Sequence, residues 1–302
     1  MPASIRVGLV GCGAWARHIL RDLLALDCDV CVAVRSEASR HRAAEAGVAT
    51  VPSVDELPEV DGIVIAVPTT AHADVARRSL ELGVPVFVEK PLATDAEQAR
   101  QLAVDADGLL FVMDKWRYHP GIEELALIAS SGELGRVLGL RAIRTGWGDP
   151  HPDVDPVWTL APHDLAIGLE ILGELPPAVA AAGEVIAGKQ WGMHALLGRR
   201  PWLAIESSGA SPSRRREVRL FCEDGMAWLA DPYAETVALI RADAMGLEPE
   251  LRLISTELPL LRELRAFVEH VAGGPAPKSS AADGALVVER LEELRSLALA
   301  GP

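Results

Sequence analysis

The tripeptide Glu89-Lys90-Pro91 has residue types that could do chemistry, in a setting that would present them to a ligand. It follows residues 86–88, an unbroken β-branched and aromatic run that predicts a short buried strand of a parallel sheet. Open α/β sheets bind ligands just beyond the carboxyl ends of their strands. Pro91 ends the strand and restricts Lys90 to extended backbone angles. We therefore expect Lys90 to reach a ligand; the alternative is a solvated charge pair at a strand end.

A second candidate site is the glycine-containing stretch near the start of the chain. Gly11 and Gly13 occupy the first two positions of G-x-G-x-x-G/A, and Ala16 occupies the third. The first glycine makes the turn, the second lets backbone approach a pyrophosphate, and the third small residue allows close helix packing. The stretch follows a predicted strand and opens a predicted helix, whose amino end faces the phosphates. We therefore predict a dinucleotide site that includes Gly11, Gly13, Ala14 and Trp15.

The end of the second predicted strand distinguishes between cofactors. A carboxylate there would bond the adenosine ribose 2′-hydroxyl of NAD. This chain instead has Arg35 and Ser36 about where that Asp is expected, with Arg40 one helical turn later. A guanidinium and a hydroxyl suit a 2′-phosphate, so we favour NADP over NAD. The alternative is a surface arginine beside a helix-capping serine.

The elements that must position these residues alternate between strand and helix. Strands are expected at residues 5–10, 30–34, 48–51, 62–67, 86–88 and 109–113, with helices at 14–26, 37–46 and 94–106 and a further helix that ends at 82. This alternation predicts a doubly wound parallel sheet, for which the Rossmann order is the obvious topology.

Beyond Asp114 the chain becomes rich in predicted strands. They are expected at residues 137–145, 179–187, 191–197, 202–208, 217–222, 226–229 and 236–240. Helices are expected at residues 122–129, 162–172, 259–272 and 282–299. We predict an α/β Rossmann domain at residues 1–118, followed by an α+β domain at residues 119–302 with a largely antiparallel sheet. The C-terminal helix could pack back on the first domain.

Composition limits the classes of function. The chain has 302 residues, which suits two domains rather than one core. Its net charge of −14 argues against nucleic acid and anionic membrane partners. The apolar runs are too short to cross a bilayer, and no signal peptide is expected before the first strand. The four cysteines have no zinc-like or disulfide pattern, so we expect free thiols and a cytoplasmic location.

Several motifs, in order along the chain, resemble the glucose–fructose oxidoreductase, inositol dehydrogenase and MocA (Gfo/Idh/MocA) family. The resembling stretches are residues 8–16, 61–72, 82–92, 131–135, 158–164 and 275–293. The resemblance covers nearly the whole chain, and Glu-Lys-Pro at this position is fairly specific. It implies a Rossmann domain followed by an open-faced sheet domain that often supports oligomers. It also implies a cis Lys90–Pro91 bond.

The resemblance extends to individual residues. It implies that Lys90 binds substrate and assists proton transfer. The resembling motifs also place Pro68, Thr69, His72, Glu89 and Lys90 among the expected cofactor contacts.

His163 is the expected acid/base residue. Pro162 suits the first turn of a helix. A helix amino end disfavours imidazolium, so we expect a neutral ring that accepts the hydroxyl proton when an alcohol is oxidised. The family often has an Asp four residues earlier, where this chain has Thr159, which cannot ionise. Lys90 and His163 are then the expected catalytic pair, with a structural histidine as the alternative. Asp164 could orient the site or cap the helix.

Residues 146–158 form an expected loop with two tryptophans and several aspartates. Aromatic faces with carboxylates suit sugar recognition, and a Trp-rich lid would exclude water. The alternative is a polar surface loop with buried tryptophans, and the spacing fits no standard metal site. Residues 115–118 are expected to line a cleft between the domains. The expected substrate contacts are Lys90, Lys115, Trp116, Arg117, Tyr118, Trp147, Trp158, Thr159 and His163.

These features predict an NADP-dependent oxidoreductase. We expect hydride transfer between nicotinamide and a secondary alcohol or ketone of a sugar, a cyclitol or a nucleotide-linked sugar. An imine or enone reductase of the same fold, and a non-catalytic NADP-sensing regulator, are the alternatives. Few helices remain to cover both faces of the second domain's sheet, so a homodimer or homotetramer is expected.

Overall fold

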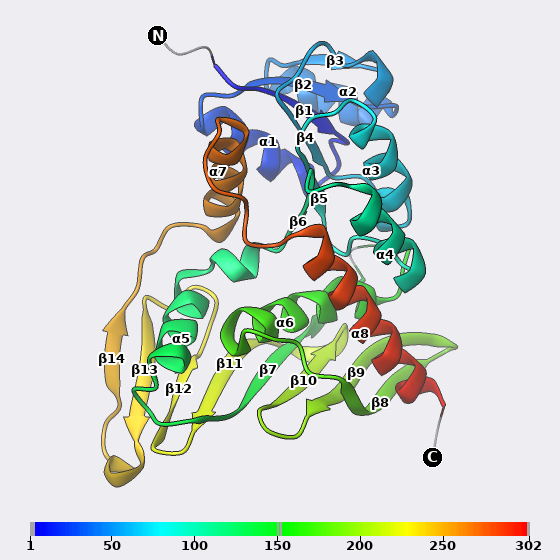
Figure 1. The fold of residues 1–302 in the computed structure, drawn as a ribbon. Coiled ribbons are helices and arrows are strands. Elements are labelled where there is room, and N and C mark those ends of the chain that lie inside the picture. The colour runs from blue at the N-terminus through cyan, green and yellow to red at the C-terminus, as the bar shows by residue number, and fades with distance from the viewer. Residues whose placement is uncertain (1–3, 150, 152, 301–302) are drawn as a thin grey trace. The chain divides into compact units, whose positions relative to one another are not determined.

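The computed structural model describes residues 4–149, 151 and 153–300 (Figure 1). These residues form two compact units. The first comprises the described residues up to Lys115 together with Leu258–Val288, and the second comprises Trp116–Glu257 together with the described residues from Glu289 onward. The sequence predicts one boundary after residue 118. In the structure, residues 258–288 also belong to the first unit.

The first unit is built on a six-stranded parallel sheet. Its strands are β1 (Arg6–Val10), β2 (Asp29–Ala33), β3 (Ala49–Val51), β4 (Gly62–Ile65), β5 (Val86–Glu89) and β6 (Leu110–Met113). Its helices are α1 (Ala16–Ala25), α2 (Glu37–Glu45), α3 (His72–Leu80), α4 (Ala96–Asp105) and α7 (Pro259–Val271). The strand order β3-β2-β1-β4-β5-β6 is the Rossmann order, which confirms the predicted doubly wound sheet.

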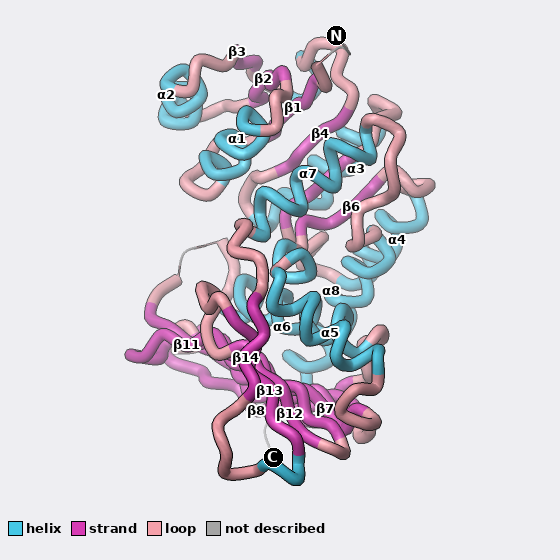
Figure 2. The backbone as a smooth tube through the Cα atoms, turned by 90° about the vertical axis from the view of Figure 1, so that its left-hand side faces the viewer, coloured by secondary structure: helices cyan, strands magenta, loops and turns pink. Residues whose placement is uncertain are grey.

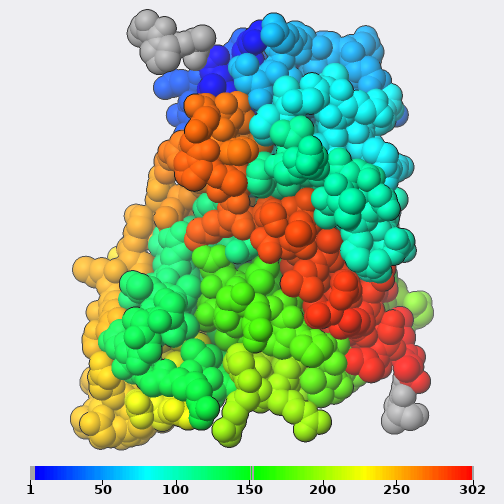
Figure 3. All heavy atoms as spheres, viewed as in Figure 1, coloured from blue at the N-terminus to red at the C-terminus, as the bar shows by residue number. Residues whose placement is uncertain are grey.

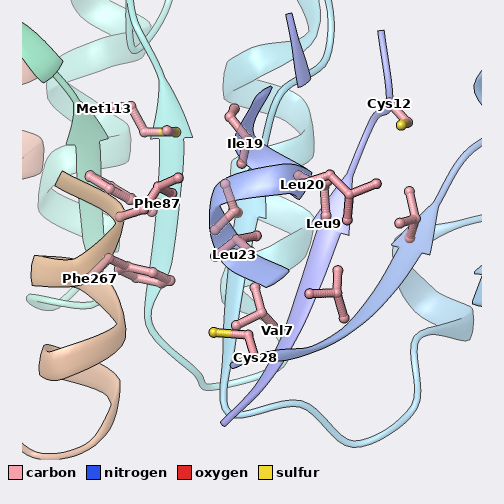
Figure 4. Close-up of a cluster of buried hydrophobic side chains, with 14 of the residues drawn as sticks. Val7, Leu9, Cys12, Ile19, Leu20, Leu23, Cys28, Phe87, Met113 and Phe267 are labelled. Carbon is pink, nitrogen blue, oxygen red and sulfur yellow. The ribbon is translucent and has the colours of Figure 1, made fainter. Parts of the chain in front are cut away.

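Helices cover both faces of this sheet, with α1 and α7 on one side and α3 and α4 on the other (Figure 1). The outer surfaces of α3 and α4 are the cyan and teal atoms at the right of Figure 3. Helix α7 buries Leu260, Leu264 and Phe267, which lie four and three residues apart on one helix face. Phe267 stacks on Phe87 of β5, with ring centroids 4.9 Å apart (Figure 4). This apolar face explains why α7 belongs to the first unit.

The second unit contains an eight-stranded sheet. Its strands are β7 (Val137–Trp147), β8 (Ala178–Ile186), β9 (Lys189–Gly198), β10 (Trp202–Ser208), β11 (Ala210–Cys222), β12 (Gly225–Leu229), β13 (Thr236–Arg241) and β14 (Glu250–Leu253), in the order β14-β13-β12-β11-β7-β10-β9-β8. Strands β7 and β10 pair in parallel, and the other neighbours pair antiparallel. A mostly antiparallel sheet is therefore confirmed.

Helices lie on one face of this second sheet. Figure 2 shows α5 (Pro120–Ser131) and α6 (Pro156–Leu172) on the same side of the strands. The residues that face them, such as Leu140, Leu203 and Leu220, are fully buried. On the opposite face Trp202 and Phe221 lie side by side and are only half-buried. The expectation of an open-faced sheet is confirmed. The last helix, α8 (Ala281–Leu299), begins in the first unit and ends in the second.

Helix α6 begins six residues earlier than the sequence predicts. Asp155 precedes it with extended backbone angles, and Pro156 takes the first turn, where a missing N–H costs nothing. Pro162, which the sequence suggests as the first residue, lies inside the helix. The idea that a helix amino end keeps His163 neutral is therefore wrong, because His163 lies in the middle of α6.

Two strands also differ from expectation. Strand β11 begins at Ala210 rather than 217, and β14 is not predicted at all; it has four residues, of which three are exposed. All four cysteines are free, as expected. Among the described helices, none combines the length and the apolar content needed to cross a bilayer.

Candidate functional site

The turn between β1 and α1 has the shape that a phosphate group needs. Gly11 has a φ of +95°, and a Cβ there would come within 2.4 Å of the Ala66 carbonyl oxygen, so only glycine fits. A Cβ on Gly13 would meet nothing within 4 Å, and Ala14 beside it is exposed. No side chain caps the amino end of α1. The turn therefore leaves room and backbone donors for a pyrophosphate, which fits a dinucleotide.

Three residues predicted from separate motifs meet at the carboxyl ends of β1, β5 and β6. The indole Nε1–H of Trp15 donates to Oε1 of Glu89, whose Oε2 accepts the backbone N–H of Lys90 at 3.2 Å. The Lys115 ammonium lies 3.8 Å from the Trp15 ring centroid, in a cation–π contact. Lys115, expected near substrate, thus belongs to this cluster. The contacts tie the glycine turn to the Glu-Lys-Pro segment, whose Lys90–Pro91 bond is cis as the resemblance implies.

His72 connects two loops rather than facing outward. Its ring is buried, with Nδ1 2.7 Å from the Pro91 carbonyl oxygen and Nε2 3.1 Å from that of Val67. Burial lowers the pKa of His72, and the hydrogen bonds to the two carbonyl oxygens oppose that shift. The sequence predicts a cofactor contact here. In the structure, His72 joins the segment after Lys90 to the loop after β4. Of its neighbours after β4, Pro68 is exposed and Thr69 is buried.

Glu263 of α7 also belongs to this region, and the sequence does not predict it. The side chain is 1% exposed, and its Oε2 has no hydrogen-bond partner among the described residues. Burial and the nearby Glu89 carboxylate raise the pKa of Glu263 well above its ordinary value, while Lys115 opposes them. The only signal in the sequence is a glutamate inside an apolar helix face.

The chain after β2 presents cationic groups to solvent. Arg35, Ser36 and Arg40 are exposed, and Arg40 Nη1 donates to the Arg35 carbonyl oxygen at 2.8 Å. Ser36 caps α2 by accepting the backbone N–H of Ser39 at 3.2 Å. The alternative interpretation, a helix-capping serine, is therefore also correct. Arg42, which the sequence does not single out, donates to the Cys12 carbonyl oxygen of the glycine turn at 2.9 Å. These residues could hold a 2′-phosphate.

In the second unit, α6 presents Thr159 and His163 one helical turn apart, so they share a face of the helix. His163 is half-buried. Asp164 is buried and does not cap the helix: its Oδ1 accepts from Arg144 Nε at 2.8 Å and its Oδ2 accepts from Ser207 Oγ at 2.9 Å. Burial pushes the pKa of Asp164 upward and Arg144 opposes this. Because a guanidinium keeps its proton, we assign a charged pair that anchors α6 to β7.

Residues 116–118 pack inside the second unit. The Trp116 ring stacks on His119, with centroids 5.1 Å apart, and the Arg144 guanidinium lies 4.4 Å from the Trp116 ring centroid. Arg117 forms a mostly buried ion pair with Glu170 of α6, at 2.9 Å, and Tyr118 is buried. These contacts support the second unit, and the predicted role in substrate binding stays a prediction.

The predicted loop places its two tryptophans differently. Trp147, at the end of β7, is 79% exposed, whereas Trp158 is 8% exposed, lies on α6 and contacts the Arg295 guanidinium. Two loop aspartates are neutralised: Asp149 pairs with Lys189, and Asp155 pairs with Arg295 at 3.0 Å. Residues 150 and 152 lie outside the described residues. Within the part of the chain that is described, no cluster of three or more possible ligands could hold a metal.

The two proposed catalytic side chains come from different units. Lys90 follows β5 in the first unit, and His163 lies on α6 in the second. Their action on one substrate therefore stays a prediction.

Residues 5–109 match the model of an oxidoreductase family with an NAD-binding Rossmann fold. Inositol 2-dehydrogenase 2 of Saccharopolyspora erythraea is 31% identical over 186 residues, which are 57% of this chain and 55% of that protein. UDP-N-acetylglucosamine 3-dehydrogenase of Acidithiobacillus ferrooxidans is 31% identical over 185 residues, which are 59% of this chain and 58% of that protein. The matching stretch thus spans little more than half the length of these relatives.

Solved structures resemble the chain over nearly its whole length. A structure of the UDP-N-acetylglucosamine 3-dehydrogenase from Acidithiobacillus ferrooxidans has a TM-score of 0.84 at 25% identity and covers 98% of both chains. A 3-ketoreductase from Actinomadura kijaniata, in complex with TDP-benzene and NADP, has a TM-score of 0.85 at 22% identity over 98% of both chains. Because the 3-ketoreductase is only 22% identical to this chain, its similarity establishes a shared fold and nothing more.

Proposed function

The chain belongs, through its NAD-binding Rossmann domain, to the Gfo/Idh/MocA oxidoreductase family, and from that premise we propose that it is an NADP-dependent oxidoreductase. The proposed reaction is hydride transfer between nicotinamide and a secondary alcohol or ketone of a sugar, a cyclitol or a nucleotide-linked sugar. One observation carries the proposal: Glu89 bonds both the glycine-turn residue Trp15 and the backbone of Lys90. These hydrogen bonds join the proposed dinucleotide turn to the lysine that we propose takes part in catalysis, at one sheet edge.

The choice of NADP rests on the end of β2. Arg35 and Arg40 are exposed there with the Ser36 hydroxyl beside them. A bound NADP would supply the hydride acceptor or donor, while these two guanidinium groups would hold its 2′-phosphate by charge-assisted hydrogen bonds. Gly11, Gly13 and the uncapped start of α1 would hold its pyrophosphate.

The proton chemistry is assigned to His163 and Lys90. Alcohol oxidation needs a base that accepts the hydroxyl proton, and a histidine suits that task near neutral pH. His163 precedes Asp164, which Arg144 and Ser207 fix in place, so its backbone is held firmly. Thr159 shares the helix face and can hydrogen-bond a substrate oxygen. Lys90 would position the same oxygen, and its backbone is held by Glu89.

The experiment is a panel of sugars, cyclitols, nucleotide sugars and cyclic imines, each assayed with NADP, NADPH, NAD and NADH by absorbance at the nicotinamide band. We expect turnover with a secondary alcohol or its ketone and a preference for the phosphorylated cofactor. Turnover of imines alone would make the chain an imine reductase. Tight NADP binding without turnover of any compound would make it a sensor and would refute the proposed activity.

A further inference from the structure

Two arginines stand opposite each other on the helix-bearing face of the second unit's sheet. Arg144 of β7 is in register with Arg216 of β11. Residues directly opposite in an antiparallel pair point to the same side of the sheet. Arg144 points toward α6, where it bonds Asp164, so Arg216 points toward α6 as well. Like charges in opposed positions destabilise a sheet unless something compensates them.

A single carboxylate serves both arginines: Asp164 is hydrogen-bonded by Arg144 and also raises the pKa of Arg216. Asp164 is bonded by Arg144 and by Ser207. Arg216 Nη1 instead donates to two neutral carbonyl oxygens, those of Thr145 and Arg215. Among residues 4–149, 151 and 153–300, no carboxylate forms an ion pair with Arg216. The two arginines and Asp164 together therefore carry one positive charge, in a chain whose net charge is −14.

The Arg216 guanidinium is also reachable. Its side chain is half-buried, and burial together with Arg144 lowers its pKa to about 10. Its two terminal nitrogens lie 3.9 and 4.0 Å from where a Cβ on Gly146 would stand, so the glycine keeps this side of the group uncrowded. A guanidinium has five N–H donors, and an anion that reached the remaining ones would form charge-assisted hydrogen bonds.

An exposed aromatic side chain accompanies Arg216. Tyr233 is 74% exposed and lies close enough to Arg216 to raise its pKa. A large aromatic group left in water beside a cationic group suits a ligand that has both a flat or apolar face and a negative charge.

We infer that Arg216 binds an anionic group, a phosphate or a carboxylate, carried by the sugar substrate. The inference rests on the proposed function and narrows it, because a neutral sugar or cyclitol has nothing to neutralise Arg216. Tyr233 would contact the sugar or an attached base. Asp164 lies near Arg216 and directly follows His163, so the anion site and the proposed base share one region of the second unit.

The test measures ligand binding to the full chain saturated with NADP, by titration calorimetry. The probes are UDP-glucose, glucose 6-phosphate and glucuronate, with glucose as the neutral reference. The variants are Arg216→Gln, Arg216→Lys and, as a matched control, Arg219→Gln. Arg219 lies on the same strand but on its opposite face, where it pairs with Glu217. Circular dichroism and NADP affinity report whether each variant is folded.

We expect at least one anionic probe to bind more tightly than glucose. Arg216→Gln should weaken that probe by about ten- to a hundredfold, as expected for a hydrogen bond to a charged group. Arg216→Lys should retain part of the affinity, and Arg219→Gln should retain all of it. The anionic probe that responds identifies phosphate or carboxylate as the bound group.

Other outcomes separate this inference from the proposed function. If glucose binds as tightly as every anionic probe, or if Arg216→Gln binds them like the wild type, the inference is overturned. Turnover of neutral polyols would leave the proposed oxidoreductase intact in that case. Conversely, anionic binding that depends on Arg216, without hydride transfer to any probe, would support the anion site and refute the activity.

Discussion

Replacing Glu263 with glutamine should increase stability relative to the wild type as the pH rises. Burial and the adjacent Glu89 carboxylate raise the pKa of Glu263 well above the ordinary 4.5. Below pH 4.5 the group is protonated in both folded and unfolded states and contributes no difference. Between pH 4.5 and the pKa of Glu263 in the folded state, the folded protein holds one proton more than the unfolded protein. In this range Glu263 lowers the free energy of unfolding of the wild type by about 1.4 kcal/mol for each pH unit of increase. Glutamine does not ionise and escapes this loss.

The measurement is urea unfolding of both proteins at pH 5, 6, 7 and 8, followed by circular dichroism. The expected result is a difference in unfolding free energy, variant minus wild type, that grows with pH at close to the slope given above and levels off once Glu263 ionises in the folded state. Glu269→Gln serves as the control, because Glu269 is an exposed carboxyl on the same helix. A difference for Glu263→Gln that stays constant with pH would show that Glu263 titrates like an exposed glutamate.

Four further expectations concern the cofactor, the chemistry, the second unit and assembly. Arg35→Asp should weaken NADP binding by about ten- to a hundredfold and improve NAD relative to it; an unchanged ratio in NADPH and NADH fluorescence titrations would remove the argument. His163→Ala should lower kcat by about 10²–10⁴-fold at nearly constant NADP affinity, Lys90→Ala should also raise KM, and the double variant should be scarcely worse than the poorer single. Retention of more than about a tenth of wild-type kcat would make His163 structural. Asp164→Ala should cost about 3–5 kcal/mol in urea unfolding because it leaves Arg144 buried and unpaired, and a loss below about 1 kcal/mol would argue against a charged pair. Light scattering should find a dimer or tetramer, since half-buried Trp202 and Phe221 lie on an uncovered sheet face; a monomer at micromolar concentration contradicts this.

Local patterns are sufficient to predict the first sheet. The predicted strands of the first unit are short, mostly apolar runs, and the glycine turn and Glu89-Lys90 follow such runs directly. What depends on partners far along the chain was missed. Either Pro156 or Pro162 could occupy the first turn of the helix, so the local sequence does not decide between them. The sequence favours Pro162, but the helix begins at Pro156. Asp164 reads as a cap, yet its partners Arg144 and Ser207 come from two different strands.

Helix α7 shows why the extent of the first unit could not be predicted from its own sequence. A Cβ on Gly62 of β4 would approach Val271 to 2.8 Å and Phe267 to 3.1 Å. The close packing of α7 on this strand therefore requires a glycine at its first position. Read alone, a glycine in a strand indicates only a weak point or a close approach of unknown origin. The same helix delivers Glu263 to the region of Glu89. The chain therefore completes its dinucleotide-binding core only after all eight strands of the second unit have been made, and the electrostatic environment of the Glu-Lys-Pro segment depends on that late return.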